Sequence, residues 1–396
     1  MDSVQFMNPH FSLFSKSRWR LPQIFVCGLG LLGLMAARPA LARSGLTVQN
    51  GVLMKDGSPY RGIGANYDTL FGRILRNKDD TSSLDNLAHL AQSGIPFVRF
   101  RASGFSPADQ ALYLQNPDEF FRRMDKVVQC AEKNHIGLIP SFFWRLATVE
   151  ELENEPPSQV GNPNSRTSAY IRTFTRALVT RYKDSPAIWG WEFGNEANLA
   201  VDNPTGAGRD VRRFGLLPST QVALTSSQLR SAYQLFAQTV RQYDSYRIIE
   251  PGTTIPRKAA WHNARGQFWQ PDSNAQYCQA LLNLTPDPMN VISAHVYPRA
   301  HELLPNGANQ IEQVIPLLMQ ASSNSRKPLF IGEFPVRDRE QTAQFLRAIV
   351  SNSVPLSAFW VFDNKAQEAT MSVGFDNERS FVLDLVAQAN KTLGGH

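Results

Sequence analysis

The sequence predicts a single (β/α)8 barrel, and three observations lead to this fold class. The chain has 396 residues with a hydrophobic content of 42%, enough to bury the core of one large domain. Eight short apolar segments alternate with longer amphipathic stretches, as repeated βα units require. No glycine-rich nucleotide-binding motif follows the first apolar segment, which disfavours an open doubly wound sheet.

The eight predicted strands are short and apolar, as parallel strands buried on both faces are. They are Arg61–Tyr67, Phe97–Ala102, Gly137–Phe143, Ile188–Gly194, Arg247–Glu250, Val291–Tyr297, Leu329–Phe334 and Ala358–Phe362. Amphipathic periodicity predicts helices over Leu84–Gln92, Pro117–Asn134, Arg166–Tyr182, Ser227–Tyr243, Gln310–Gln320 and Glu340–Ser351.

Two further features complete the expected domain. Leu46–Tyr60 carries the turn signals Asn50-Gly51 and Asp56-Gly57 between alternating apolar residues, which predicts a small β-hairpin capping one end of the barrel. The connections Ala197–Ser226 and Gly252–Asn290 are longer than ordinary loops. We expect both at the carboxyl end of the strands, where this fold builds its active sites.

Residues 1–42 resemble a cleavable secretory signal peptide. Basic residues precede an apolar run of 14 residues at 24–37, and positions 40–42 read Ala-Leu-Ala. A transmembrane helix needs about 20 apolar residues, so cleavage after Ala42 is favoured over a membrane anchor. We therefore expect a secreted or periplasmic protein without a stable membrane anchor, whose mature chain 43–396 is one catalytic domain.

Charge and cysteine content limit the classes of partner and cofactor. Without residues 1–42 the chain keeps 36 basic and 33 acidic residues; this net charge of +3, spread without a basic run, argues against nucleic-acid binding. Cys130 and Cys278 are expected to be separate buried thiols, while an oxidising compartment would permit a disulfide. The sequence has no His-Glu-x-x-His motif and no Cys/His cluster, so we expect chemistry without a metal, and we also expect no cofactor. Separately, a monomer is expected.

Two glutamates fall at the ends of predicted strands that are not neighbours in the barrel. Glu196 follows the fourth strand in Trp-Glu-Phe-Gly-Asn-Glu, and Glu333 ends the seventh in Phe-Ile-Gly-Glu-Phe. Their side chains are expected to face each other across the barrel mouth. Glycoside hydrolysis needs this arrangement, because one carboxyl protonates the leaving oxygen while the other attacks the sugar or activates water. We predict Glu196 as catalytic acid/base and Glu333 as nucleophile.

Over residues 46–390 the chain is similar to glycoside hydrolase clan A, and within it to family 5, which contains cellulases and β-mannanases. Asn195-Glu196 and Glu333 match the two carboxylate motifs of that family. The resemblance implies further substrate-binding positions at other strand ends. These are Arg99 on strand two, His295 and Tyr297 on strand six, and Trp360 on strand eight.

The resemblance implies that Arg99 contacts the nucleophile. Its charge would favour the ionised form of Glu333, and the Tyr297 hydroxyl would hold that carboxylate by a hydrogen bond. A structural alternative is a buried ion pair between Arg99 and Glu192. Arg101 shares the strand face of Arg99 and is the rival for the same role.

The other matched residues have roles implied by the same resemblance. Asn195 would donate to the 2-hydroxyl of the reacting sugar, and Trp360 would form the platform beneath it. His295 would point into the mouth, unless it is a satisfied core histidine. Residues 66–68 and Glu250 end strands one and five and are additional candidate contacts.

One position departs from the family pattern. Family 5 cellulases commonly carry a histidine near the tip of strand three, where this chain reads Ser-Phe-Phe-Trp144. Some mannanases of the family also lack that histidine, so the departure leaves the sugar backbone open. Trp144, Trp261 and Trp269 are predicted either as sugar platforms or as packing under long loops.

The leading hypothesis is a retaining glycoside hydrolase that cuts a β-1,4-linked polysaccharide, either mannan and glucomannan or cellulose and related β-glucan. One alternative is an exo-acting β-glycosidase or a transglycosylase on the same fold. The other is a non-catalytic secreted barrel that binds carbohydrate. Both glutamates and their supports are present, which disfavours the non-catalytic alternative.

Overall fold

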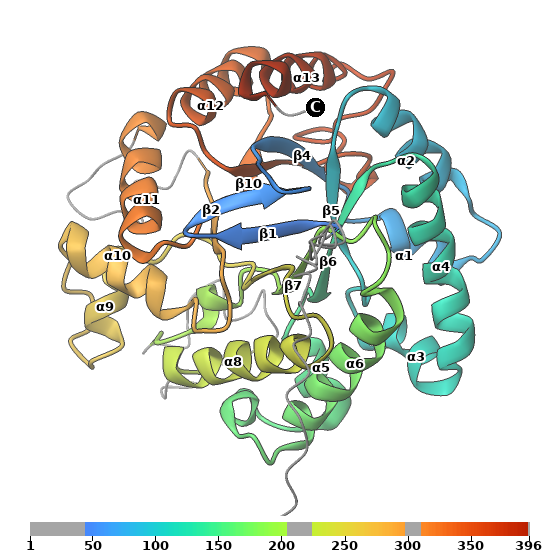
Figure 1. Cartoon of the computed structure of the whole chain (residues 1–396). Helices are drawn as coiled ribbons and strands as arrows, with labels where there is room; N and C mark the ends of the chain where they lie inside the picture. The colour runs from blue at the N-terminus through green and yellow to red at the C-terminus, as the bar shows by residue number, and fades with distance from the viewer. Residues whose placement is uncertain (1–43, 204–223, 298–309, 395–396) are drawn as a thin grey trace, which may run out of the picture. The chain divides into compact units, whose positions relative to one another are not determined.

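The computed structural model describes residues 44–203, 224–297 and 310–394. Eight parallel strands form one sheet in the order β8-β7-β6-β5-β4-β11-β10-β9, with helices around its outside (Figure 1). The strands are β4 Gly62–Asn66, β5 Phe97–Arg101, β6 Gly137–Phe143, β7 Gly190–Gly194, β8 Ile248–Glu250, β9 Ile292–His295, β10 Leu329–Pro335 and β11 Leu356–Trp360. Each overlaps one predicted strand, and the predicted (β/α)8 barrel is confirmed.

Hydrogen bonds close the sheet into a barrel at its two edge strands. The backbone N–H groups of Asn290 and Val291, just before β9, both donate to the carbonyl oxygen of Ile249 in β8, at 3.1 and 3.3 Å. The last helix also returns to the first barrel strand. The Asn390 side chain accepts from the N–H of Ile63 at 2.7 Å and donates to its carbonyl oxygen at 2.9 Å.

The helices include all six predicted segments. They are α1 Leu70–Arg76, α2 Ser82–Gln92, α3 Pro107–Gln115, α4 Pro117–Lys133, α5 Ala147–Glu153, α6 Arg166–Tyr182, α8 Ser226–Tyr243, α9 Ala260–Asn263, α10 Asn274–Asn283, α11 Ile311–Ser325, α12 Arg339–Ser351 and α13 Phe381–Leu393. Capping boxes define the starts of α3, through Ser106 and Asp109, and of α8, through Thr225 and Gln228. No helix in the described ranges is long and apolar enough to cross a membrane.

The predicted hairpin is present and is extended by a third, very short strand. Strands β1 Leu46–Gln49, β2 Val52–Lys55 and β3 Ser58–Pro59 form an antiparallel sheet that lies across the amino-terminal end of the barrel (Figure 1). Leu46, Leu53 and Tyr60 pack there against apolar side chains at the amino-terminal ends of the barrel strands. This apolar cluster closes one end of the barrel.

The long connection after β8 is partly helical, because it contains α9 and α10. Of the long connection after β7, residues 204–223 lie outside the described residues, as does the predicted signal peptide. Cys130 and Cys278 are separate free thiols, as expected, but each is only partly buried.

Candidate active site

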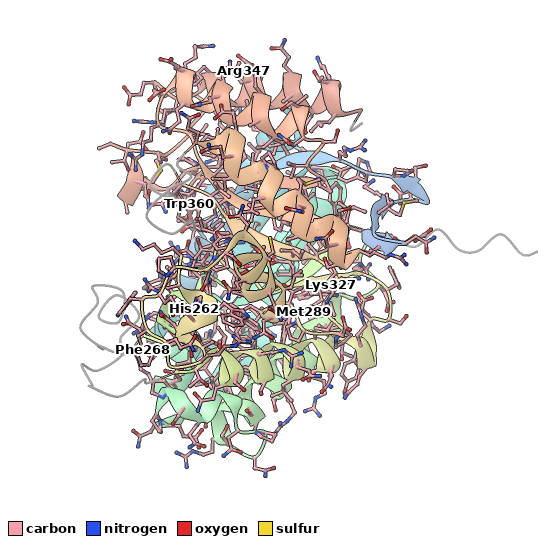
Figure 2. All side chains as sticks on the ribbon, turned by 90° about the vertical axis from the view of Figure 1, so that its left-hand side faces the viewer. His262, Phe268, Met289, Lys327, Arg347 and Trp360 are labelled. Atoms are coloured by element: carbon pink, nitrogen blue, oxygen red, sulfur yellow. The ribbon has the colours of Figure 1, made fainter. Side chains whose placement is uncertain are left out.

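A cavity of about 910 Å³ opens at the carboxyl end of the barrel strands, opposite the β1–β3 sheet. Figure 2 views the barrel from the side, with Trp360 at the left and the hairpin at the right. All eight predicted site residues meet here. Six of them line the cavity: Trp144, Asn195, Glu196, Tyr297, Glu333 and Trp360. Arg99 and His295 are fully buried and contact the two glutamates.

The two glutamates reach the cavity from opposite sides of the barrel. Glu333 lies within β10, in register with His295 of β9. Glu196 follows β7 and has a left-handed backbone conformation with φ of 49°, which is uncommon for a residue other than glycine. One oxygen of each carboxylate and one ring nitrogen of His295 all lie within 4.8 Å of one another.

His295 bridges the two carboxylates. Its Nδ1 lies 3.2 Å from Oε1 of Glu196 and 3.4 Å from Oε1 of Glu333. The ring is fully buried and packs on Gly332, where an added Cβ would come within 2.8 Å of Nε2. Glycine at position 332 therefore leaves the space that the histidine ring occupies.

Arg99 connects the nucleophile candidate to a buried acidic residue. Its Nη1 donates to Oε1 of Glu333 at 2.9 Å and to Oδ1 of Asn66 at 2.8 Å. Its Nη2 donates to Oε1 of Glu192 and to Oδ1 of Asn195, both at 2.8 Å, and its Nε donates to the other Glu192 oxygen. The contact with Glu333 and the structural ion pair with Glu192 thus both exist, on one fully buried guanidinium.

Arg101, the rival for this role, does not contact Glu333. Its Nη2 pairs with Asp68 at 2.9 Å, and Asp68 also accepts from the Asn364 side chain. Asp68 lines the cavity, but Asn66 and Tyr67 are fully buried. Of these three candidate contacts, only Asp68 therefore reaches the cavity. Asn66 instead orients Arg99, a role that the sequence pattern did not indicate.

The charge state of Glu333 is set by opposing influences. Burial raises its pKa above the usual value, and the negative charge of Glu196 acts in the same direction. His295, Arg99 and the hydroxyl of Tyr297, which donates to Oε2, lower the pKa and partly offset burial. Burial also raises the pKa of Tyr297 well above its usual value, so the phenol remains a hydrogen-bond donor.

Glu250, kept as a candidate substrate contact, has no exposed surface and does not reach the cavity. It lies opposite Glu192 on the neighbouring strand, and its Oε2 accepts from the N–H of Gly252 at 2.6 Å. Burial and the charge of Glu192 raise the pKa of Glu250 well above its usual value. Burial also acts to raise the pKa of Glu192, but Arg99 and hydrogen bonds hold it below its usual value. These opposite shifts favour a protonated Glu250 beside an ionised Glu192.

Two tryptophans form an aromatic surface in the cavity. The rings of Trp144 and Trp360 are stacked, with centroids 6.0 Å apart and an interplanar angle of 22°. Trp144 directly follows β6, at the strand tip where family 5 cellulases commonly carry a histidine. The Arg99 guanidinium lies 4.5 Å from the centroid of its ring. Neither Trp261 nor Trp269 lines this cavity. Trp261 stacks on a neighbouring arginine, and Trp269 is 48% exposed.

Comparisons with known proteins agree with this arrangement. The family model for cellulase (glycosyl hydrolase family 5) matches residues 64–366. A mannan endo-1,4-beta-mannosidase A of Podospora anserina is 27% identical over 197 residues, which are 44% of this chain and 51% of that protein. A probable mannan endo-1,4-beta-mannosidase A of Aspergillus flavus is 30% identical over 141 residues, 31% of this chain and 36% of that protein. The chain spans about half the length, or less, of these curated relatives.

Solved structures share the fold at low sequence identity. An endo-1,4-beta-mannanase from Rhizomucor miehei has a TM-score of 0.67 and 15% identity, over 89% of this chain and 100% of that chain. An exo-beta-1,4-mannosidase from an Opitutaceae bacterium has a TM-score of 0.60 and 15% identity, over 88% of this chain and 63% of that one. Since the family model spans more than half of the chain and both carboxylate motifs, this chain belongs to glycosyl hydrolase family 5.

Proposed function

We propose that this protein is a retaining glycoside hydrolase that cuts β-1,4-linked polysaccharide, with Glu333 as nucleophile and Glu196 as acid/base. The separation of the two carboxylates carries this proposal, because their nearest oxygens lie within 4.8 Å. Retaining enzymes hold their carboxyl groups about 5–5.5 Å apart and inverting enzymes about 6.5–9.5 Å, so a close approach of single oxygens supports the retaining class.

The reaction proceeds in two displacements. In the first, a Glu333 oxygen attacks the anomeric carbon while Glu196 gives its proton to the departing glycosidic oxygen, and a glycosyl ester forms on Glu333. In the second, Glu196 takes a proton from water, the water oxygen attacks the anomeric carbon, and the ester bond breaks. The products are two shorter sugar chains. Glu196 loses one proton to the leaving chain and regains one from water, so it ends protonated as it began.

Asn195 and His295 support these steps. The Oδ1 of Asn195 accepts from Arg99 at 2.8 Å, which leaves its N–H2 group to donate to the 2-hydroxyl of the reacting sugar. His295 lies within 3.4 Å of both carboxylates, and when it donates to Glu333 it favours the ionised form that attacks the sugar. Trp360 provides an apolar face beneath the sugar.

Mannan or glucomannan is our first candidate for the substrate. The curated relatives above are named as mannan endo-1,4-beta-mannosidases, and Trp144 stands at the strand tip where family cellulases commonly carry a histidine. Exo action remains the second candidate, because the similar Opitutaceae structure is an exo-beta-1,4-mannosidase. A product time course on long mannan separates the two: random shortening indicates endo action, and steady release of monomer or dimer indicates exo action.

The test of the reaction uses Glu196→Gln and Glu333→Gln, with the exposed Glu312→Gln as control. Activity is measured on mannan, carboxymethyl-cellulose, mixed-linkage glucan and xyloglucan, and NMR of the first product reports its anomeric form. We expect both site variants to lose nearly all turnover while keeping wild-type melting temperatures. Retained activity in either variant contradicts the assignment, inverted product contradicts the mechanism, and binding without any cleavage by the wild type supports a non-catalytic barrel.

We also propose that the protein is exported, with cleavage after Ala42. The basic residues, the apolar run at 24–37 and the Ala-Leu-Ala pattern support this proposal. Mass spectrometry of protein recovered from the exported fraction tests it, and a mature chain beginning at Arg43 is the expected result.

A further inference from the structure

One side of the active-site cavity carries a group of basic side chains, here called the basic wall. Its members come from α1, the end of β5, the segment after β6 and the segment after β11. They are Arg73, Arg76, Arg101, Arg145 and Lys365. Apart from the two catalytic glutamates, Asp68 is the one acidic residue among the described residues that line the cavity.

Three arginines of the basic wall are paired with carboxylates that do not themselves line the cavity. The pairs are Arg73–Asp363 at 2.7 Å, Arg76–Asp109 at 2.8 Å and Arg145–Glu151 at 2.5 Å. Each pair therefore presents its positive end to the cavity. Lys365 is exposed, and no carboxylate in the described ranges forms an ion pair with it.

The hydrogen-bonding chemistry of the basic wall does not match a neutral sugar well. A sugar hydroxyl both donates and accepts hydrogen bonds, whereas arginine and lysine side chains only donate. The carboxylate of Asp68 could accept, but its oxygens are already bound by Arg101 and Asn364. A carboxylate or sulfate group only accepts, and its bonds to guanidinium and ammonium groups are charge-assisted.

We propose that this side of the cavity binds a sugar carrying an acidic group, a carboxylate or a sulfate, so that a β-1,4-linked polysaccharide bearing such groups is cut faster than its neutral counterpart. This inference rests on the proposed hydrolase function and specifies its substrate class. Arg76, whose side chain is 61% exposed, and Lys365 are the side chains most available to the acidic group.

The experiment compares one neutral β-1,4-mannan oligosaccharide with two derivatives of the same length. One derivative is oxidised at C6 to uronate, and the other is sulfated. For the wild type we expect at least one acidic derivative to have a kcat/KM about tenfold above that of the neutral parent at low salt. This advantage should shrink in about 0.5 M NaCl, where exposed charges are screened.

The double variant Arg76→Gln/Lys365→Gln should lower the acidic-to-neutral ratio of kcat/KM by about tenfold. Arg122→Gln/Lys391→Gln is the matched control, since it removes the same charge from exposed side chains on α4 and α13, away from the cavity. The control should keep the wild-type ratio. A preference for the uronate or for the sulfate identifies which acidic group is bound.

Two outcomes separate this inference from the proposed function. If the wild type cuts the neutral oligosaccharide as well as both derivatives, or both double variants behave alike, the inference is wrong and the hydrolase assignment stands. If no oligosaccharide is cut, the hydrolase assignment fails, and calorimetry with Glu196→Gln protein decides the binding question. Tighter binding of an acidic derivative than of the neutral parent supports the basic wall as an anion-binding surface, and equal binding contradicts it.

Discussion

Glu192 and Glu250 lie opposite each other on the neighbouring parallel strands β7 and β8, and neither side chain is exposed. The Arg99 guanidinium binds both oxygens of Glu192 and also contacts Glu333. Two adjacent carboxylates in a buried site cannot both be ionised at low cost. The raised pKa of Glu250 and the lowered pKa of Glu192 favour a single proton on Glu250, and Arg99 joins the ionised Glu192 to Glu333.

Glu250→Gln should stabilise the protein as pH rises. An amide oxygen would keep the bond to Gly252, and the amide N–H would replace the proton shared with Glu192. A buried carboxyl with a raised pKa binds a proton in the folded chain that the unfolded chain releases above about pH 4.5, so wild-type stability falls with pH in that window. We expect the melting temperature of the variant to match wild type near about pH 4 and to exceed it by a few degrees near about pH 7.

The exposed Glu340→Gln serves as the control for this series and should show no pH-dependent difference from wild type. Calorimetric scans at several pH values supply the measurement. A difference between Glu250→Gln and wild type that stays constant from acid to neutral pH would show that Glu250 is ionised in the folded protein.

Tyr297→Phe should slow catalysis and move its pH dependence. The phenol donates to Glu333 and lowers the pKa of that carboxyl, so its removal raises the pKa. Because the nucleophile must be ionised, the acid limb of the kcat/KM profile should move to higher pH. We expect kcat to fall about 10- to 100-fold, in line with the loss of a hydrogen bond to a charged group.

Tyr60→Phe is the matched control for that experiment. The Tyr60 hydroxyl is buried at the closed end of the barrel and has no hydrogen-bond partner in the described structure. Its removal should leave the kcat/KM profile unchanged. If the acid limb of the kcat/KM profile does not move in Tyr297→Phe, the proposal that the phenol lowers the pKa of Glu333 is contradicted.

Arg99→Lys should reduce kcat/KM by about 100-fold or more, because one ammonium cannot reproduce the forked contacts to Glu333, Glu192 and Asn195. Arg247→Lys gives the comparison, since Arg247 is equally buried but binds Asp244 and backbone carbonyls near the closed end. We expect Arg247→Lys to lower the melting temperature without changing kcat. Steady-state kinetics and thermal melts of both variants provide the measurement. If Arg99→Lys, like Arg247→Lys, lost only stability, the proposed role of Arg99 at the active site would be contradicted.

Trp360→Ala should lower kcat/KM on oligosaccharides by about tenfold or more through loss of the apolar face in the cavity. Trp269→Ala is the control, because Trp269 is largely exposed and does not line that cavity. It should retain wild-type kinetics on short substrates. Equal losses in the two variants would indicate that the stack of Trp144 and Trp360 is not a sugar platform.

The sequence predicted the parts of the molecule that repeat or follow strand ends. Alternating apolar strands and amphipathic helices define the barrel, and the strand ends place Glu196 and Glu333 at one mouth. The sequence could not resolve whether Arg99 or Arg101 faces Glu333, because strand alternation puts both on the same face. Burial decides between them: Arg99 is fully enclosed among acidic groups, and Arg101 pairs with Asp68 nearer the surface.

Other features depend on contacts that no local pattern reveals. Glu250 ends a predicted strand, as Glu333 does, but its side chain is fully buried. Glu192 lies in register with it on the next strand, and the two buried side chains form a pair. Asn66 binds Arg99 and backbone carbonyls of β10 and β11, which requires the first barrel strand to pair with the last one in the sequence. The basic wall likewise consists of side chains from four segments that are far apart in the sequence.

The β1–β3 sheet has a practical consequence for handling this protein. Ser44 contacts the buried Arg247 at the closed end of the barrel, while Glu196 and Glu333 line the cavity at the far end. A linker joined ahead of Ser44 would therefore leave the active-site cavity facing away from the support to which the linker is attached. Immobilised on a bead or displayed on a particle through that terminus, the domain would present its cleft outward to a polymer too large to diffuse around it.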